Sequence, residues 1–273
     1  MHQEQPVIRG LIEVFKEGRG TKELSEAALR ALAEVSLRKT IRSGQCLWRM
    51  GDPADFVGII LRGGFEVSRL SSVGNEYSLA VFGPADAIGM SAVLQKKAYP
   101  GTARAFSRSA EVVKIYLRPL IQRTGDPLAI ELSDWLRELL IVHEQILRDK
   151  IDIVSAGRVG EKVFELLLQL NRRFGVRTSR TASRIPLKLS KTQVSRMVDA
   201  RVETVIRLLG LWNKKNLVSF GSLGIDVSDW AELEKEVERG KSDRPYTKGA
   251  PPTACTKKWA LHPPILLEDS LQE

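Results

Sequence analysis

The chain has only two cysteines and three histidines among its 273 residues. Cys46 and Cys255 are too few and too far apart to predict a disulfide framework or a cysteine metal site. No segment approaches the roughly 18 uninterrupted apolar residues of a membrane span. The polar start, Met1-His-Gln-Glu-Gln-Pro, lacks the apolar run of a signal peptide. These absences predict a cytoplasmic protein with no membrane contact.

Sequence motifs of common enzyme classes are also missing. There is no phosphate-binding loop, no nucleophile elbow and no cluster of metal ligands. The histidines, at positions 2, 143 and 262, have no ligand spacing. We therefore expect neither catalysis nor a bound metal.

Positive charge is present, and it is concentrated in one segment. The chain carries 42 Lys and Arg against 33 Asp and Glu, a net charge of +9. Residues 155–227 hold 14 of the basic and 5 of the acidic residues, which leaves the remainder balanced at 28 of each. Localised positive charge is typical of proteins that bind nucleic-acid phosphates. A membrane surface or an acidic protein could attract the same charge.

Residues 191–213, inside that basic segment, have the pattern of two short helices joined by a tight turn. Ser190 is a favourable N-cap for the first helix. Asp199-Ala200 stands in the turn, where aspartate tolerates a left-handed backbone better than most residues. Four apolar residues follow at helical spacing: Val205, Leu208, Leu209 and Trp212. This pattern is typical of a helix-turn-helix, whose second helix, here 202–213, enters the major groove of DNA.

The opposite face of the second helix carries Glu203, Thr204 and Arg207. An arginine can donate two hydrogen bonds to guanine, and a carboxylate can accept one from cytosine. The alternative is a solvated salt bridge between Glu203 and Arg207, which lie one turn apart. The basic surroundings favour DNA contact.

The N-terminal half has a different pattern. Residues 5–37 show helical periodicity, notably at Leu11, Val14, Phe15 and Ala27–Val35. From Arg38 to about Ile115, short apolar segments alternate with turns rich in Gly, Pro, Asp and Asn, as in an all-β barrel or jelly roll. The expected strands lie in residues 39–48, 56–61, 65–70, 77–82, 102–106 and 112–116.

A long helix is predicted over residues 127–154, which span about 42 Å at 1.5 Å per residue. Positions 132, 136, 139, 143, 146, 150 and 153 form a heptad-like seam of Leu, Leu, Leu, His, Ile, Lys and Ile. Such a seam favours pairing with a second copy of the chain. The alternative is a helix that packs on its own barrel. His143 could bind an effector, ligate haem or a metal, respond to pH, or only fix the register of the seam.

The remaining elements complete the expected architecture. A hinge at 155–157, an amphipathic helix at 159–174 and wing strands at 217–220 and 223–227 surround the helix-turn-helix. We predict an α+β chain of four parts: N-terminal helices with an antiparallel β-jelly-roll (1–126), a dimerisation helix (127–154), a winged helix-turn-helix domain (155–228) and a C-terminal extension (229–273). The extension is expected to be helical over 229–238, then polar, Pro-rich and partly disordered.

Four stretches carry a family resemblance. They are Gly44-Gln-Cys-Leu-Trp-Arg-Met-Gly51, Ile59-Ile-Leu-Arg-Gly-Gly-Phe-Glu-Val67, Phe82-Gly-Pro-Ala-Asp-Ala-Ile-Gly89 and Val202-Glu-Thr-Val-Ile-Arg-Leu-Leu-Gly210. From about Ala33 to Val227 the chain resembles the CRP/FNR family of bacterial transcription regulators. The resemblance implies a cyclic-nucleotide-binding-like barrel, a homodimer on a palindromic double-stranded DNA site, and contact with RNA polymerase.

The resemblance also implies roles for individual residues. Glu203 and Arg207 would read bases, and four residues would support them: Arg201, Thr204, Thr192 and Gln193. Ile206 stands where the FNR-type pattern usually has serine, so the half-site sequence is left open.

Cyclic-nucleotide binders of this family have a glutamate and an arginine for the ribose and the phosphate. The corresponding positions here are Met90, after Gly89, and Gly101, before Thr102. A buried phosphate needs a paired cation or several donors, so we expect no cyclic AMP binding. Cys46 alone cannot hold an iron–sulfur cluster. Gly89, Met90, Gly101, Thr102 and His143 remain the candidate pocket for haem or another small-molecule effector.

Two functions therefore compete. The first is a dimeric, sequence-specific DNA-binding transcription regulator. The second is a regulatory or interaction module that uses the barrel without binding DNA. The localised charge and the Glu203/Arg207 face favour the first.

Overall fold

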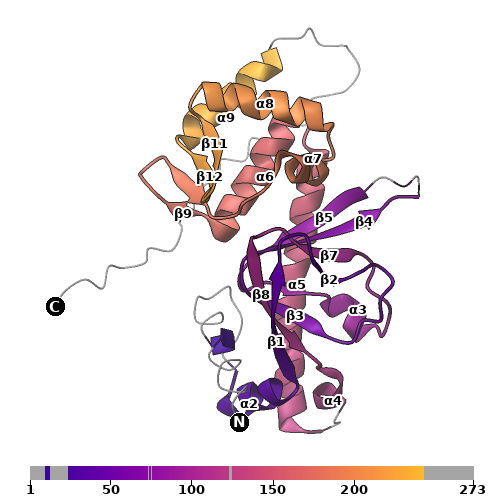
Figure 1. Ribbon diagram of the computed structural model, residues 1–273. Coiled ribbons are helices and arrows are strands. Elements are labelled where there is room, and N and C mark those ends of the chain that lie inside the picture. The colour runs from indigo at the N-terminus through magenta and orange to yellow at the C-terminus, as the bar shows by residue number, and fades with distance from the viewer. Residues whose placement is uncertain (1–9, 13–23, 73, 75, 123–124, 243–273) are drawn as a thin grey trace, which may run out of the picture.

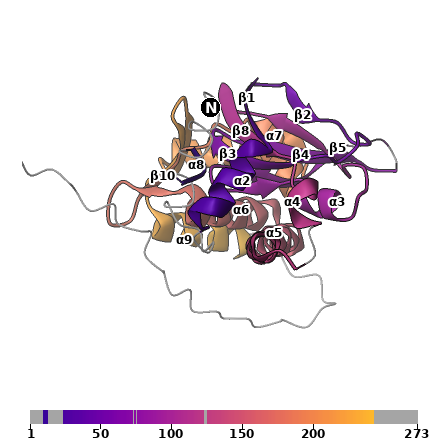
Figure 2. The same cartoon turned by 90° about the horizontal axis from the view of Figure 1, so that it is seen from below.

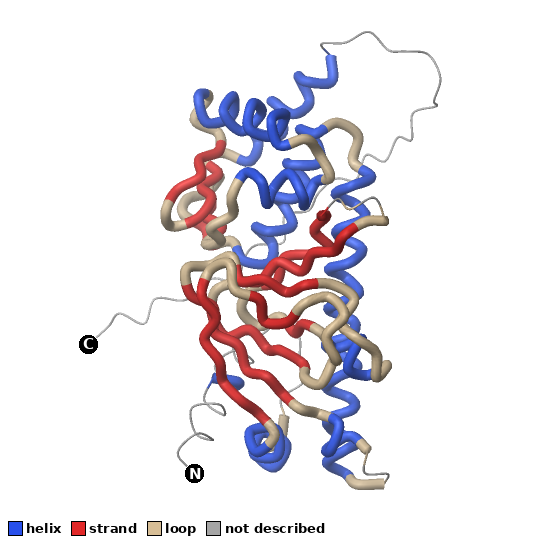
Figure 3. The backbone as a smooth tube through the Cα atoms, turned by 45° about the vertical axis from the view of Figure 1, so that its right-hand side comes forward, coloured by secondary structure: helices blue, strands red, loops and turns tan. Residues whose placement is uncertain are grey.

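The computed structural model describes residues 10–12, 24–72, 74, 76–122 and 125–242. A β-barrel and a second domain of helices and strands lie at opposite ends of the molecule, and one long helix runs beside both (Figure 1, Figure 3). The predicted α+β class is confirmed, with an antiparallel barrel, a long helix and a winged helix-turn-helix domain in that order. The expectations for Val14, Phe15 and the tail from residue 243 lie outside the described residues.

Two four-stranded antiparallel sheets form the barrel, with strand orders β1-β8-β3-β6 and β2-β7-β4-β5. The strands are β1 (Ser36–Arg42), β2 (Cys46–Trp48), β3 (Val57–Arg62), β4 (Phe65–Leu70), β5 (Glu76–Phe82), β6 (Ala87–Ile88), β7 (Thr102–Ala105) and β8 (Ser109–Ile115). Every predicted strand region contains a strand. The sequence missed β6, because two residues are too short to show alternation.

Residues 10–12 are helical, and the described chain has three further short helices beside the barrel: α2 (Glu26–Glu34), α3 (Met90–Leu94) and α4 (Arg118–Ile121). Ser25 caps α2 by accepting a hydrogen bond from Ala28 N at 3.1 Å. The same serine donates through its hydroxyl to Glu131 on the long helix at 2.8 Å. The N-terminal segment is thereby tied to the helix that links the two domains.

The long helix, α5 (Pro127–Ser155), confirms the predicted element, but its heptad seam does not face outward. Leu132, Leu136, Leu139 and Ile146 belong to the barrel core, and Ile153 belongs to the core of the second domain. At the other two seam positions, His143 stacks on Phe82 and Lys150 donates to the Met197 carbonyl. The prediction that this seam pairs two copies is wrong. A heptad pattern identifies the buried face of a helix, not what buries it.

The side of α5 away from the barrel exposes four large aliphatic side chains, Ile130, Ile141, Leu147 and Ile151, which are 57%, 65%, 41% and 61% exposed. They form a broken apolar stripe, because the exposed ion pairs of Arg137 with Asp134 and of Arg148 with Glu144 lie among them. Figure 2 looks almost along α5 and shows the barrel on one side of the helix only. The apolar stripe therefore has no cover within the described chain.

The second domain is a winged helix-turn-helix. Its helices are α6 (Val159–Phe174), α7 (Lys191–Val198), α8 (Val202–Lys214) and α9 (Trp230–Ser242). Its sheet has the order β11-β12-β10-β9, with strands β9 (Val176–Arg177), β10 (Ser183–Ile185), β11 (Val218–Gly221) and β12 (Gly224–Val227). The predicted wing is the hairpin of β11 and β12. The predicted helix over 229–238 is α9, which buries Leu233 completely and stacks Trp230 edge-on against Phe164.

Ion pairs join the two domains. The Arg196 guanidinium on α7 binds both carboxylate oxygens of Glu66 on β4, at 2.6 and 3.1 Å. The Glu66 side chain is only 3% exposed, and Arg196 also reaches Glu76 at 3.3 Å. Arg173 on α6 pairs with the buried Asp86 and donates to the Val81 carbonyl at 3.0 Å. These contacts fix how the helix-turn-helix sits on the barrel.

The exchange Glu66→Gln tests the strength of this junction. It removes one charge from a buried pair but leaves Arg196 partly exposed and near Glu76, so we expect a loss of about 1–3 kcal/mol in the free energy of unfolding. Urea unfolding measures the loss. Glu26→Gln is the matched control, because Glu26 and its partner Arg30 are 80% and 69% exposed and such pairs contribute little. Equal, small losses in both variants would contradict a structural role for Glu66.

Candidate nucleic-acid interface and effector pocket

A reciprocal cap sets the start of α7. The Ser190 hydroxyl accepts from Gln193 N at 3.1 Å, and the Gln193 side-chain oxygen accepts from Ser190 N at 2.8 Å. This capping box satisfies two donors at the helix terminus. It also engages the side-chain oxygen of Gln193, which leaves the amide NH₂ for an outside partner. Thr192, beside it in the first turn, is exposed.

The turn between α7 and α8 has the predicted form. Asp199 takes the left-handed conformation, with φ of 50° and ψ of 62°. Ala200 N then donates to the Ser195 carbonyl at 3.0 Å, which closes the turn. Arg201 is the N-cap of α8 but makes no side-chain capping bond, and it is exposed. The Arg201 side chain is therefore free for an outside partner at the start of α8.

The two faces of α8 differ as predicted. Val205, Leu209 and Trp212 are at most 2% exposed and anchor the helix in the domain core. Glu203 and Arg207 are exposed, and neither forms an ion pair within the described part of the chain. The alternative of a salt bridge between them is therefore not formed, and both side chains are available to an outside partner.

The other predicted contact residues lie around this pair. Thr204 is half-buried, whereas Ile206 is 44% exposed. Figure 1 shows α8 at the end of the molecule farthest from α2, with the barrel on the far side of α6 and α7. No described element covers the outward face of α8. The structure thus brings Arg201, Glu203, Thr204 and Arg207 to one accessible end, with Thr192 and Gln193 on the preceding helix.

The candidate effector residues lie in a packed part of the barrel. Gly89 precedes α3 with φ of +81°, and a Cβ there would lie 2.8 Å from Tyr99 and 3.0 Å from Trp48. Met90 is fully buried. The Gly101 carbonyl accepts a hydrogen bond from Trp48 Nε1 at 2.9 Å, and Thr102 Oγ1 accepts one from Met50 N at 3.0 Å. These polar groups are engaged by the protein itself.

Aromatic side chains fill the space beside these residues. Trp48 and Tyr99 stack with centroids 4.0 Å apart, and both rings contact Phe56 edge-on. Tyr99 is 1% exposed and donates its hydroxyl to the Phe56 carbonyl at 2.6 Å. Burial raises the pKa of Tyr99, so the hydroxyl stays neutral. Sequence reasoning missed this aromatic trio, because its members come from three separate segments.

Neither position that would hold the ribose or the phosphate of a cyclic nucleotide carries a charged side chain. Met90 is uncharged and Gly101 has no side chain. Arg104 lies between the buried Ala103 and Ala105, and its guanidinium donates to the Gly44 carbonyl at 3.0 Å. It therefore points out of the barrel, as the alternation of a strand predicts.

His143 does not lie in one pocket with the other four candidate effector residues. Its ring stacks on Phe82 with centroids 5.7 Å apart, and Asp86 and Arg173 are its charged neighbours. Burial lowers the pKa of His143; Arg173 adds to this effect and Asp86 opposes it. These surroundings are packed and charged, and they do not fit the open apolar slot of a haem. Among the described residues, no three His, Cys, Asp or Glu are grouped to hold a metal ion.

The described helices include none long and apolar enough to cross a membrane. Two family models match the chain and together cover more than half of it. The model for the Cyclic nucleotide-binding domain matches residues 38–122. The model for the Crp-like helix-turn-helix domain matches residues 161–236, which includes part of α9.

Characterised relatives match across both domains. The Transcriptional activator protein Anr of Pseudomonas protegens is 25% identical over 74% of this chain and 82% of its own length. The CRP-like cAMP-activated global transcriptional regulator of Mycobacterium tuberculosis is 23% identical over 77% of this chain and 92% of its own. The crystal structure of TTHB099, a CRP-family transcriptional regulator of Thermus thermophilus, covers 73% of this chain and 96% of its own at 21% identity, with a TM-score of 0.59.

The aromatic packing leads to a test with cyclic AMP. A ligand that binds only the folded state raises the melting temperature, and we expect saturating cyclic AMP to leave it unchanged. Trp48→Ala tests whether the aromatic trio is part of the hydrophobic core. This exchange should lower the free energy of unfolding by about 3–5 kcal/mol, as other buried large-to-small exchanges do. A saturable rise in melting temperature with cyclic AMP would show that the aromatic side chains leave room for it.

Proposed function

The chain belongs to the CRP/FNR family of DNA-binding transcription regulators, and we propose that it acts as a homodimer that reads a palindromic site without a cyclic nucleotide. The observation that carries this proposal is the outward face of α8. Glu203 and Arg207 are exposed, unpaired and one turn apart on a helix whose opposite face is firmly buried. We assign them to base edges in the major groove, with Arg201, Thr204, Thr192 and Gln193 as supporting contacts.

The dimer is proposed on the apolar stripe of α5. Ile141 and Ile151 are 65% and 61% exposed, and Ile151 adjoins the exposed Leu147 one turn away, so together they give α5 several aliphatic side chains that a partner could cover. A two-fold axis parallel to α5 would bring two stripes together and place both copies of α8 at the same end. Two recognition helices in that arrangement suit half-sites about one helical turn of DNA apart.

Independence from cyclic nucleotides is supported by the barrel interior. Trp48, Phe56 and Tyr99 pack against the β6–α3 and β7 segments, and Met90 and Gly101 supply no charge. The ion pairs of Arg196 and Arg173 already dock the helix-turn-helix on the barrel. Because no cyclic nucleotide is needed to dock the helix-turn-helix, DNA affinity would depend only on dimerisation and on the DNA sequence.

Three further assignments follow from this role. The protein would act where the DNA is, in the cytoplasm of a bacterium. It would contact RNA polymerase, as the resemblance implies. Its role would be regulatory rather than catalytic. The second candidate, an interaction module without DNA binding, is disfavoured by the unpaired Glu203 and Arg207.

The exchange Arg207→Ala tests base reading by α8. Loss of one good bidentate contact should weaken binding to the preferred site by about 1–3 kcal/mol and relax the preference for guanine at one position of each half-site. Gel-shift titrations on matched and mutated palindromes measure both effects. Arg49→Ala, at an exposed position on the barrel, removes the same charge and should change little. Specific binding that survives Arg207→Ala unchanged would refute this assignment.

The double exchange Ile141→Glu with Ile151→Glu tests the dimer surface. Placing two acidic side chains in the apolar stripe should give monomers in analytical ultracentrifugation and weaken binding to a full palindrome far more than binding to one half-site. Leu70→Glu is the control, because Leu70 is 57% exposed on the barrel, away from α5. Dimers that persist in the double variant would place the interface elsewhere.

A further inference from the structure

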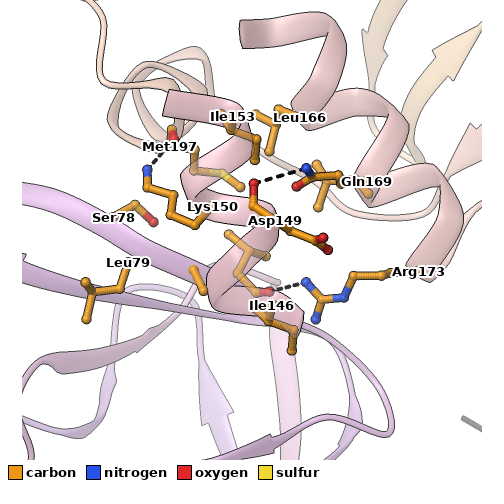
Figure 4. A pocket seen from close by; sticks show the side chains of 13 residues that line it. Ser78, Leu79, Ile146, Asp149, Lys150, Ile153, Leu166, Gln169, Arg173 and Met197 are labelled. Carbon is orange, nitrogen blue, oxygen red and sulfur yellow. Dashed lines mark hydrogen bonds between the residues drawn. The ribbon is translucent and has the colours of Figure 1, made fainter. Parts of the chain in front are cut away.

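A small cavity lies where the barrel meets α5, α6 and α7 (Figure 4). Its 13 lining residues include Ser78 on β5, Lys150 on α5, Gln169 on α6 and Met197 on α7. The volume is about 30 Å³ and the cavity is partly open to solvent, so it can hold a few atoms but cannot enclose a nucleotide or haem. The cavity is separate from the α8 surface and from the aromatic trio.

Lys150 brings a positive charge to this cavity without a matching carboxylate. Its ammonium donates to the Met197 carbonyl and forms no ion pair within the described residues. Burial lowers the pKa of Lys150 to about 8; Lys162 adds to that effect, while Asp199 and Glu66 oppose it from a distance. Glu66 is already held by Arg196. A half-buried cation with only a carbonyl partner is costly unless an anion neutralises it.

Ser78 adds an unmatched hydroxyl. The residue is completely buried, and its Oγ has no hydrogen-bond partner in the described part of the chain. Figure 4 shows Ser78 beside the Lys150 side chain, whose ammonium group points toward the Met197 carbonyl. A serine hydroxyl can donate to an anion as readily as an ammonium can.

The other polar groups of the cavity are already engaged. The Gln169 amide donates to the Asp149 carbonyl at 3.0 Å and to Glu165 at 2.9 Å. Asp149 Oδ1 accepts from Gln145 at 2.9 Å. Arg173 is bound to Asp86 and to the Val81 carbonyl. The Lys150 ammonium and the Ser78 hydroxyl keep donors that no described residue uses, and a negatively charged acceptor on the side away from the Asp149 carboxylate would satisfy both.

We propose that this cavity binds a small monovalent anion, between a halide and formate in size, held by the Lys150 ammonium and the Ser78 hydroxyl. A water molecule would satisfy Ser78 but would not neutralise Lys150. Because Ser78 belongs to the barrel and Lys150 also bonds α7, the anion ties the helix-turn-helix to the barrel. The site is independent of the proposed DNA contacts and adds a further link beside the ion pairs of Arg196 and Arg173.

The anion of the buffer salt is changed from gluconate, which the cavity cannot enclose, to chloride at constant ionic strength. The melting temperature of the wild-type chain should rise with chloride and saturate. In Lys150→Met it should not rise, and in gluconate this variant should melt at or above the wild type because the unneutralised charge is gone. Lys97→Met, which removes an exposed lysine of the barrel, should behave like the wild type.

Two further measurements detect anion binding even if Lys150→Met folds poorly. Ser78→Ala should raise the half-saturating chloride concentration several-fold. The NMR line of chloride should broaden with wild-type protein, and nitrate or formate should reverse the broadening by competition. The same chloride response in wild type and Lys150→Met, or no line broadening with the wild type, would overturn the proposal and leave a cavity that holds only water.

Discussion

The pairing of Arg196 with Glu66 is the contact on which the arrangement of the domains depends. Glu66 is almost completely buried on β4, so its charge must be met by a partner. That partner comes from α7, the first helix of the helix-turn-helix, and binds both carboxylate oxygens. A bidentate pair fixes orientation as well as distance. Since α7 packs on α8 through a tight turn, the pair also fixes where α8 points.

The barrel and the helix-turn-helix differ in which side-chain groups they leave free to bind a ligand. The outward face of α8 carries the charged, exposed side chains of Glu203 and Arg207 on a helix whose other face is buried. The barrel interior instead holds Trp48 stacked on Tyr99, and its hydrogen-bonding groups are used by the protein. A barrel of this kind serves as a rigid support. It positions α7 through Glu66 and α6 through Asp86.

Much of this could be predicted from local patterns. The helix α6 begins and ends at the predicted residues, because its amphipathic stretch lies between Gly157 and Gly175. The left-handed Asp199 and the capping serine at 190 were also readable, since both depend on neighbours within a few residues. The two-residue β6 and the helix α3 were not predicted, because short elements carry no periodic signal.

The remaining misses share one physical cause, which is contact between distant segments. The α5 seam at Leu132, Leu136 and Leu139 was correctly seen as a buried face but was assigned to the wrong partner. The hydrogen bond from Trp48 to Gly101 and the pairing of Glu66 with Arg196 join residues 53 and 130 positions apart. The spacing of residues along the chain does not predict such pairs.

The central claim is that two copies of this chain read a symmetric DNA sequence with no cyclic nucleotide present. Selection of binding sites from a random duplex library, in ligand-free buffer, tests it most directly. We expect enrichment of inverted half-sites whose centres lie about one helical turn apart. Enrichment of no sequence, or enrichment that appears only when cyclic AMP is added, would contradict it.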